Sequence, residues 1–180
     1  MFSFFKNRSS NKKLIARLYH SIAQTALRPV FFEEYQVPDT LEGRFEILAL
    51  HMAVVLRHVK QLPAPAEDVA RDLTDYYFEQ LDDVLRELGT SDNKVPKKMK
   101  QMAGAFLHRA GTYDAALAAQ DMEQLKNALA GYFGPELDTG RLAGYVLDAD
   151  RTMYDFSLDM ILENGISFPA SLRIPEKTDE

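Results

Sequence analysis

The chain of 180 residues contains no cysteine. This absence excludes disulfides, thiol catalysis and zinc or iron–sulfur sites with cysteine ligands. No apolar run approaches the roughly 20 residues that a membrane-spanning helix needs. A secretory signal is not expected either, because the opening "MFSFF" is followed at once by Lys6 and Arg8. With 46% hydrophobic residues, the composition favours a folded single domain.

Charge is distributed unevenly along the chain. The whole sequence has 27 acidic and 21 basic side chains, for a net charge of -6. Residues 1–60 hold nine basic and five acidic side chains, whereas residues 121–180 hold five and twelve. A basic front and an acidic back indicate that the front meets an anionic partner.

Apolar residues recur at helical spacing almost everywhere, and no alternating strand pattern of useful length is present. We therefore predict an all-α, single-domain bundle of about six helices. The expected segments are a basic and aromatic front (1–10), a helical domain (11–163) and an extended tail (164–180). The expected helices are 11–27, 39–62, 65–88, 96–110, 121–132 and 139–162, with a further short helix across 113–119.

The residues needed for catalysis are not found in a recognisable pattern. None of the four histidines follows an acidic residue by three positions, and the sequence has no His-Glu-x-x-His, Gly-x-Ser-x-Gly or P-loop motif. His51 and His58 lie about 10 Å apart on one helix face, so we expect two buried imidazoles and no shared metal. We predict no catalytic residue, metal or cofactor, and an enzyme or cofactor carrier is the weaker hypothesis. A solvated acidic face is expected at Asp148, Asp150, Asp155 and Asp159.

Four lysines crowd the start of the predicted helix 96–110, where the backbone is already electropositive. A cation there costs about 0.3–1 kcal/mol. Unfavourable positive charges at a helix start, with no visible compensation, suggest a function, although surface lysines are also common. On a helical wheel Leu107 falls on the inner side with the methionines, whereas His108 and Arg109 fall on the outer side with the lysines. The predicted anion-binding or partner-binding surface comprises Lys94, Lys97, Lys98, Lys100, His108 and Arg109.

The anion that this surface meets is less well defined. No aromatic residue interrupts the stretch from Lys94 to Lys100, and the net charge is negative, so sequence-specific nucleic-acid binding is not expected. An acidic partner protein, a lipid headgroup or a small contact on the ribosome surface all stay open.

The front of the chain provides a second candidate contact. Aromatic and basic side chains together suit the interface of an anionic membrane. The alternatives are aromatic side chains that pack back on the bundle and a short organelle transit peptide. The residues concerned are Phe2, Phe4, Phe5, Lys6, Arg8, Lys12 and Lys13.

Two stretches, "DTLEGRFEILALH" (39–51) and "LDDVLRELGTSDNKVPKKMKQMAGAFLHRAGTYDAAL" (81–117), resemble the ubiquinol–cytochrome c chaperone family. The resemblance implies a non-enzymatic, all-helical assembly factor for cytochrome b of the bc1 complex, with cytochrome b or another bc1 assembly component as its partner. Mitochondrial members act with a small partner protein near the ribosomal exit. The resemblance implies a cytoplasmic protein, peripheral at the inner membrane, in a bacterium, and a mitochondrial one in a eukaryote.

The first of these stretches contains a second group of candidate contacts for a client or partner: Asp39, Glu42, Arg44 and Glu46. The alternative is a structural role, because Asp39 and Glu42 have capping-box spacing and the other charges can form ion pairs. Gly43, near the helix start, is expected to allow close packing against another backbone. In the second stretch, the turn Gly89-Thr90-Ser91-Asp92 departs from the Gly-Val-Gly-Asp that family members often carry.

Overall fold

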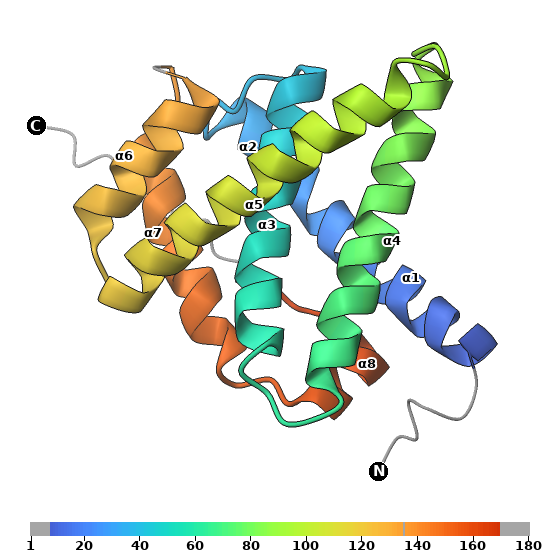
Figure 1. Ribbon diagram of the computed structural model, residues 1–180. Helices are drawn as coiled ribbons and strands as arrows, with labels where there is room; N and C mark the ends of the chain where they lie inside the picture. The colour runs from blue at the N-terminus through green and yellow to red at the C-terminus, as the bar shows by residue number, and fades with distance from the viewer. Residues whose placement is uncertain (1–7, 135, 170–180) are drawn as a thin grey trace, which may run out of the picture.

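The computed structural model describes residues 8–134 and 136–169, and over these residues it is a bundle of eight helices with no strand (Figure 1). The predicted all-α class is confirmed. The helices are α1 (Arg8–Ala26), α2 (Pro29–Glu33), α3 (Leu41–Val59), α4 (Ala66–Glu87), α5 (Val95–Ala119), α6 (Met122–Phe133), α7 (Thr139–Met153) and α8 (Leu158–Asn164).

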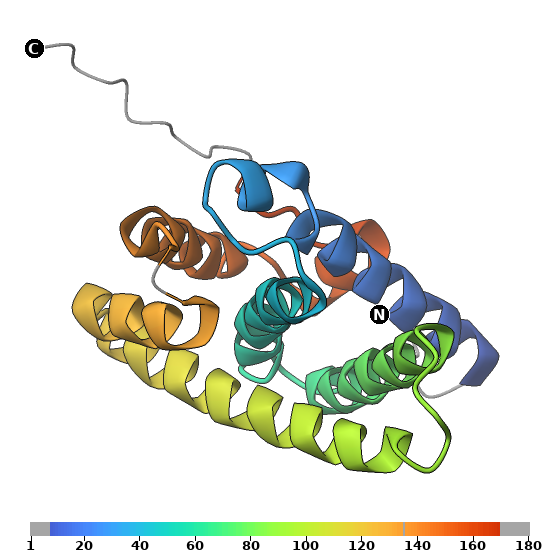
Figure 2. The same ribbon diagram turned by 90° about the horizontal axis from the view of Figure 1, so that it is seen from above.

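Helix α3 forms the centre of the bundle. It is surrounded by α1, α4, α5 and α7, as the view from above shows (Figure 2). Its sequence from Ile47 to Leu56 is apolar on all sides except at His51, and every residue in this stretch is buried. A helix that is apolar all round is stable only when other elements cover all its faces. Helix α4 returns antiparallel to α3, and α5 then starts beside the end of α4 and crosses in front of α3 (Figure 1).

The sequence predicted a helix that ends at residue 110, before Gly111. In the structure α5 continues through Gly111 to Ala119. Interior glycine costs a helix about 1 kcal/mol relative to alanine. Here the buried stripe of Phe106 and Tyr113 continues through Ala116 and Leu117 on the same side. Packing therefore outweighs the local preference for an end. The prediction of a separate helix at 113–119 is wrong for this reason.

The predicted helix 139–162 is in fact two helices, α7 and α8. The chain turns after Met153, and the Ser157 hydroxyl then accepts a hydrogen bond from the Met160 amide, which caps α8. His58 of α3 contacts the Phe156 carbonyl oxygen at 2.9 Å, which fixes the turn against the core. A second boundary was missed at α2, where Pro29 occupies the first turn and Phe31 is buried.

The predicted extended tail is partly described, and its described part belongs to the core. Residues 165–169 form no helix, yet Ile166 and Phe168 are only 5% and 8% exposed. The Ser21 hydroxyl of α1 donates a hydrogen bond to the Ile166 carbonyl oxygen. The Phe168 ring lies against His51, with 4.9 Å between ring centroids. Residues 170–180 lie outside the described part of the chain.

Candidate functional site

The start of α3 is organised by the segment 39–46. The Thr40 hydroxyl, and not Asp39, caps the helix by accepting a hydrogen bond from the Gly43 amide at 3.1 Å. Asp39 instead forms an exposed ion pair with Arg44 at 2.6 Å. A Cβ added at Gly43 would lie 1.9 Å from the Pro38 carbonyl oxygen, so the expected close approach to another backbone is present. The predicted Asp39 cap is therefore wrong by one residue, and Thr40, Asp39 and Arg44 have local structural contacts.

Glu46 of α3 and Arg109 of α5 form a bidentate ion pair inside the bundle. Their side chains are 9% and 18% exposed, and the guanidinium lies 4.7 Å from the centre of the Tyr132 ring. Burial raises the pKa of Glu46 more than its contact with Arg109 lowers it. These two predicted contact residues therefore neutralise each other, and Arg109 does not lie with the lysines on the solvent face.

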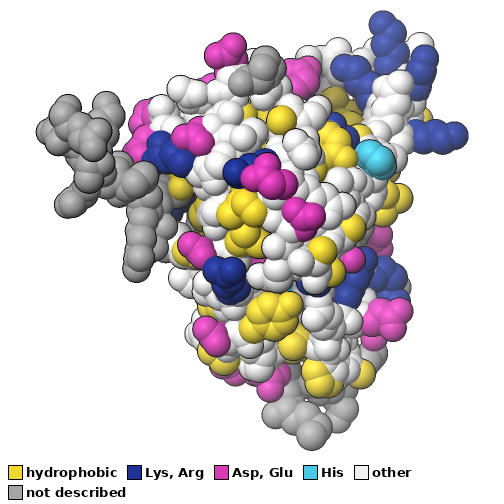
Figure 3. Space-filling model, turned by 90° about the vertical axis from the view of Figure 1, so that its left-hand side faces the viewer, with side chains coloured by type: hydrophobic (Ala, Val, Ile, Leu, Met, Phe, Trp, Pro, Cys, Tyr) yellow, Lys and Arg dark blue, Asp and Glu magenta, His cyan; other side chains and the backbone are white. Residues whose placement is uncertain are grey.

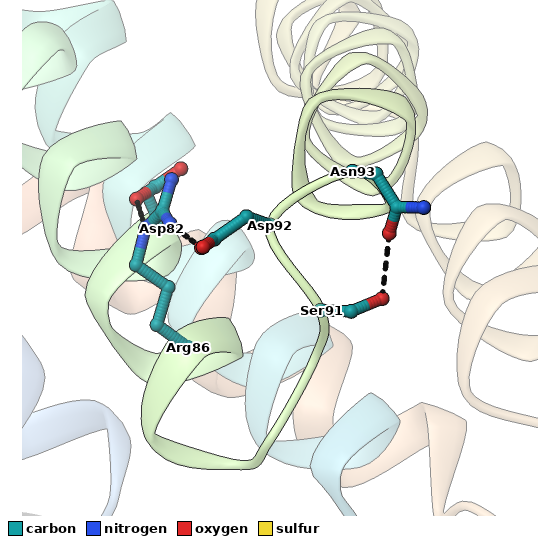
Figure 4. A network of polar contacts seen from close by, with 5 residues as sticks. All are labelled: Asp82, Arg86, Ser91, Asp92 and Asn93. Atoms are coloured by element: carbon teal, nitrogen blue, oxygen red, sulfur yellow. Dashed lines mark hydrogen bonds and ion pairs between the residues drawn. The ribbon is translucent and has the colours of Figure 1, made fainter.

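The turn between α4 and α5 determines where α5 begins. Gly89 adopts a φ of 78°, and the amides of Gly89 and Thr90 donate to the carbonyls of Arg86 and Leu85. This pair of bonds is a Schellman ending, which favours glycine at that position. Arg86 also contacts the carboxylates of both Asp82 and Asp92, so it ties the turn to α4 (Figure 4). The Asp92 charge is thus directed to Arg86 and away from the lysines.

The four lysines at the start of α5 are exposed, and none forms an ion pair with a carboxylate of residues 8–134 or 136–169. Lys98 makes one long contact, at 3.4 Å, with the Thr90 hydroxyl. In the space-filling view, Lys and Arg side chains project together from the upper right-hand edge, with no acidic side chain among them (Figure 3). His108 is also exposed, whereas Leu107, expected on the inner side, is 67% exposed.

A notch of about 200 Å³ lies where the starts of α3 and α5 meet the end of α4. Glu46, already paired with Arg109, is one of the residues that line it. The other polar lining residues are Glu42, Lys98 and Gln101. The apolar lining residues are Leu41, Phe45, Leu85 and Met102. The fold thus brings the two stretches 39–51 and 81–117 together in one site that we call the α3–α5 notch. Of the candidate residues in these stretches, only Glu42, Glu46 and Lys98 line it.

Comparisons with known proteins identify the family of the chain. The model of the family described as ubiquinol-cytochrome C chaperone matches residues 33–168, which include all three helices of the notch. The chain belongs to this chaperone family. The crystal structure of the Cbp3 homolog from Brucella abortus is similar, with 34% sequence identity and a TM-score of 0.80 over 89% of this chain and 91% of that one. No curated protein matches the chain.

Of the residues that line the notch, the sequence predictions named Glu42, Glu46 and Lys98, but not Gln101 or the apolar residues. Lysines are unfavourable at the start of a helix, and this departure can be recognised within one segment of the sequence. Leu41, Leu85 and Met102 come from three helices, and each has the spacing of an ordinary core residue. Only the exposure of Leu41, 43% in the structure, distinguishes it from a core residue, and exposure requires the fold.

His51, His58 and Asp150 each have a structural partner. His51 and His58 are both buried, as predicted. Asp150 departs from the expected solvated face, because it is 3% exposed and lies 3.3 Å from the Arg57 guanidinium. Burial raises the pKa of Asp150, while Arg57 opposes that rise. Within the described residues, no group of three or more potential ligands could hold a metal ion.

The candidate membrane contact lies mostly beyond the described residues. Phe2, Phe4, Phe5, Lys6 and the side chain of Arg8 are outside them. Lys12 and Lys13 are exposed on α1, and Lys12 pairs with Glu79 of α4 at 3.1 Å. No helix in the described part of the chain is long and apolar enough to cross a membrane.

Proposed function

We propose that this family member is a non-enzymatic assembly chaperone for cytochrome b of the bc1 complex, and that it docks through the basic start of α5. Membership of the family supports the role in bc1 assembly. The observation that supports the docking surface is the group of exposed lysines that no carboxylate of the described chain neutralises. We place this docking on the cytoplasmic side of the inner membrane in a bacterium.

The ammonium groups, and not the helix backbone, are the part of this surface that attracts an anion. The Val95 amide already donates to the Ser91 carbonyl oxygen at 3.2 Å, and Pro96 has no amide proton. Fewer backbone donors are therefore free at the start of α5 than at an ordinary helix start. Docking through exposed ammonium groups should be fast and should weaken as salt screens the charges.

The test is recovery of cytochrome b with the tagged full-length protein from native cells, with and without ongoing translation. The docking variant reverses Lys97, Lys98 and Lys100 to Glu. Thermal stability should be unchanged or higher, because the reversed charges favour a helix start. Recovery of cytochrome b should be lost.

The matched control reverses three exposed basic side chains on other elements, Arg28, Lys60 and Arg151, to Glu. It changes the net charge by the same amount but leaves α5 intact. We expect it to retain recovery of cytochrome b. Intact recovery with the α5 variant would refute docking through the basic face. Loss of recovery with the control alone would instead favour a contact outside α5.

A further inference from the structure

The α3–α5 notch is apolar on most of its walls but remains open to solvent. Leu41 is 43% exposed, and Phe45 and Met102 are half-buried. The free energy falls when another apolar group covers apolar surface that is exposed to water. Methionine is also flexible enough to adapt to side chains of different shape. The volume of about 200 Å³ suits a single large side chain rather than a whole helix.

The charges around the notch are not balanced. Glu46 is neutralised by Arg109, so it presents no free charge to a ligand. Lys98 lines one wall, and Lys94 and Lys97 are exposed on the same helix start. Glu42 is the carboxylate that lines the notch without an ion-pair partner in the described chain. The complement of this surface is an apolar side chain with carboxylates beside it.

We infer that the notch selects what the chaperone binds, by taking one large apolar side chain from an acidic protein segment while the lysines contact the carboxylates next to it. This inference rests on the proposed function and adds the chemistry of the partner segment. A nucleic acid would use exposed aromatic side chains for stacking, and Phe45, half-buried, is the aromatic residue that lines the notch. Anionic lipid headgroups could neutralise the lysines, but a lipid surface has no side chain to place in the notch. Binding to lipid is therefore the alternative result that the experiment must distinguish.

Glu42 has a distinct role in this arrangement. Its position in the first turn of α3 suits the helix dipole, so its charge is locally favourable. The same charge repels an acidic segment that enters the notch. Replacing Glu42 with Gln should therefore tighten binding of acidic segments, which a purely structural role for Glu42 does not predict.

The experiment measures binding of the full-length protein to overlapping 15-residue peptides that cover cytochrome b outside its membrane helices, by fluorescence anisotropy at low salt. Leu41→Asn should weaken the tightest peptides about 5- to 10-fold, since part of a leucine side chain loses its cover. Glu42→Gln should strengthen them about 2- to 3-fold. The control Met160→Asn changes a residue of matched exposure (44%) on α8 and should have no effect.

The outcomes separate this inference from the docking proposal. If the Lys97, Lys98 and Lys100 reversal abolishes peptide binding but Leu41→Asn and Glu42→Gln do not change it, the notch inference is overturned and docking stands. If none of these variants changes binding, both fall. The inference is also overturned if no peptide binds, or if phosphatidylglycerol vesicles bind in place of the peptides.

Discussion

The titratable ring of His51 is buried, so water does not reach it. One ring nitrogen contacts the Ile47 carbonyl oxygen at 2.8 Å, and the other contacts the Tyr145 hydroxyl at 2.7 Å. The neutral ring satisfies both when Nδ1 donates to the carbonyl and the hydroxyl donates to Nε2. Burial lowers the pKa of His51 from its usual 6.5 to about 4. The fold therefore holds the uncharged imidazole.

This shift makes the stability of the protein depend on pH. The unfolded chain binds a proton at His51 below about pH 6.5, whereas the folded chain does so only near pH 4, so acid favours unfolding in that window. The free energy of unfolding that depends on His51 should fall by about 3 kcal/mol between pH 7 and pH 4. Urea unfolding of the wild type and of His51→Gln at several pH values measures it.

The difference between the two proteins isolates His51, because Glu46 and Asp150, whose pKa values are raised, titrate in both. His51→Gln should be less stable at pH 7, and the gap should close as the pH falls to 4. A gap that stays constant over this range would show that His51 is not kept neutral by the fold.

Gly43 shows how a single position can combine local and global requirements. Its amide binds the Thr40 cap, and its missing side chain leaves room for the Pro38 carbonyl oxygen. The chain can therefore turn tightly into α3 and place Leu41 and Glu42 at the notch. Gly43 thus acts by positioning its neighbours.

At the scale of elements, the Glu46–Arg109 pair joins α3 to α5. Burying two charges costs free energy that their attraction offsets only in part, which agrees with the raised pKa of Glu46. Removing one partner is worse, because it leaves the other charge buried alone. The pair thus fixes the position of α5 over α3 more than it stabilises the fold.

A double-mutant cycle tests this view of the pair. Arg109→Met alone should lower the free energy of unfolding by about 3–5 kcal/mol, because Glu46 stays buried without its partner. Glu46→Leu with Arg109→Met should recover most of that loss, since two apolar side chains suit the site. Urea unfolding gives both values. Two single losses that simply add in the double variant would contradict a coupled pair.

The sequence was sufficient to predict elements wherever periodicity and terminus signals agreed. The stripe of α4 and the glycine ending at Gly89 are such cases. Prediction failed where tertiary packing overrode a local signal, as at Gly111 in α5 and at the turn held by His58. The same limit applied to the site: the unfavourable lysines can be recognised within one helix, whereas the notch forms only where three helices meet.

At the scale of the whole molecule, the first helix of the described chain contacts the last one. Arg17 of α1 donates a hydrogen bond to the Leu162 carbonyl oxygen of α8, and Ser21 does the same to Ile166. Phe168 then reaches His51 at the centre of α3. The expected boundary at residue 164 therefore does not coincide with the edge of the core, which extends at least to Phe168.

Two truncated chains measure how much this closing segment contributes. Deleting residues 166–180 removes Ile166 and Phe168, whereas deleting only 171–180 keeps both. The longer deletion should be less stable than the shorter one by about 3–6 kcal/mol, because each buried apolar side chain contributes about 1.5–3 kcal/mol. Urea unfolding of both chains at pH 7 gives the difference. Because His51 loses its Phe168 cover in the longer deletion, water should reach the ring and the acid sensitivity of stability should weaken as well. Equal free energies of unfolding for the two chains would mean that the segment after α8 does not contribute to the stability of the bundle.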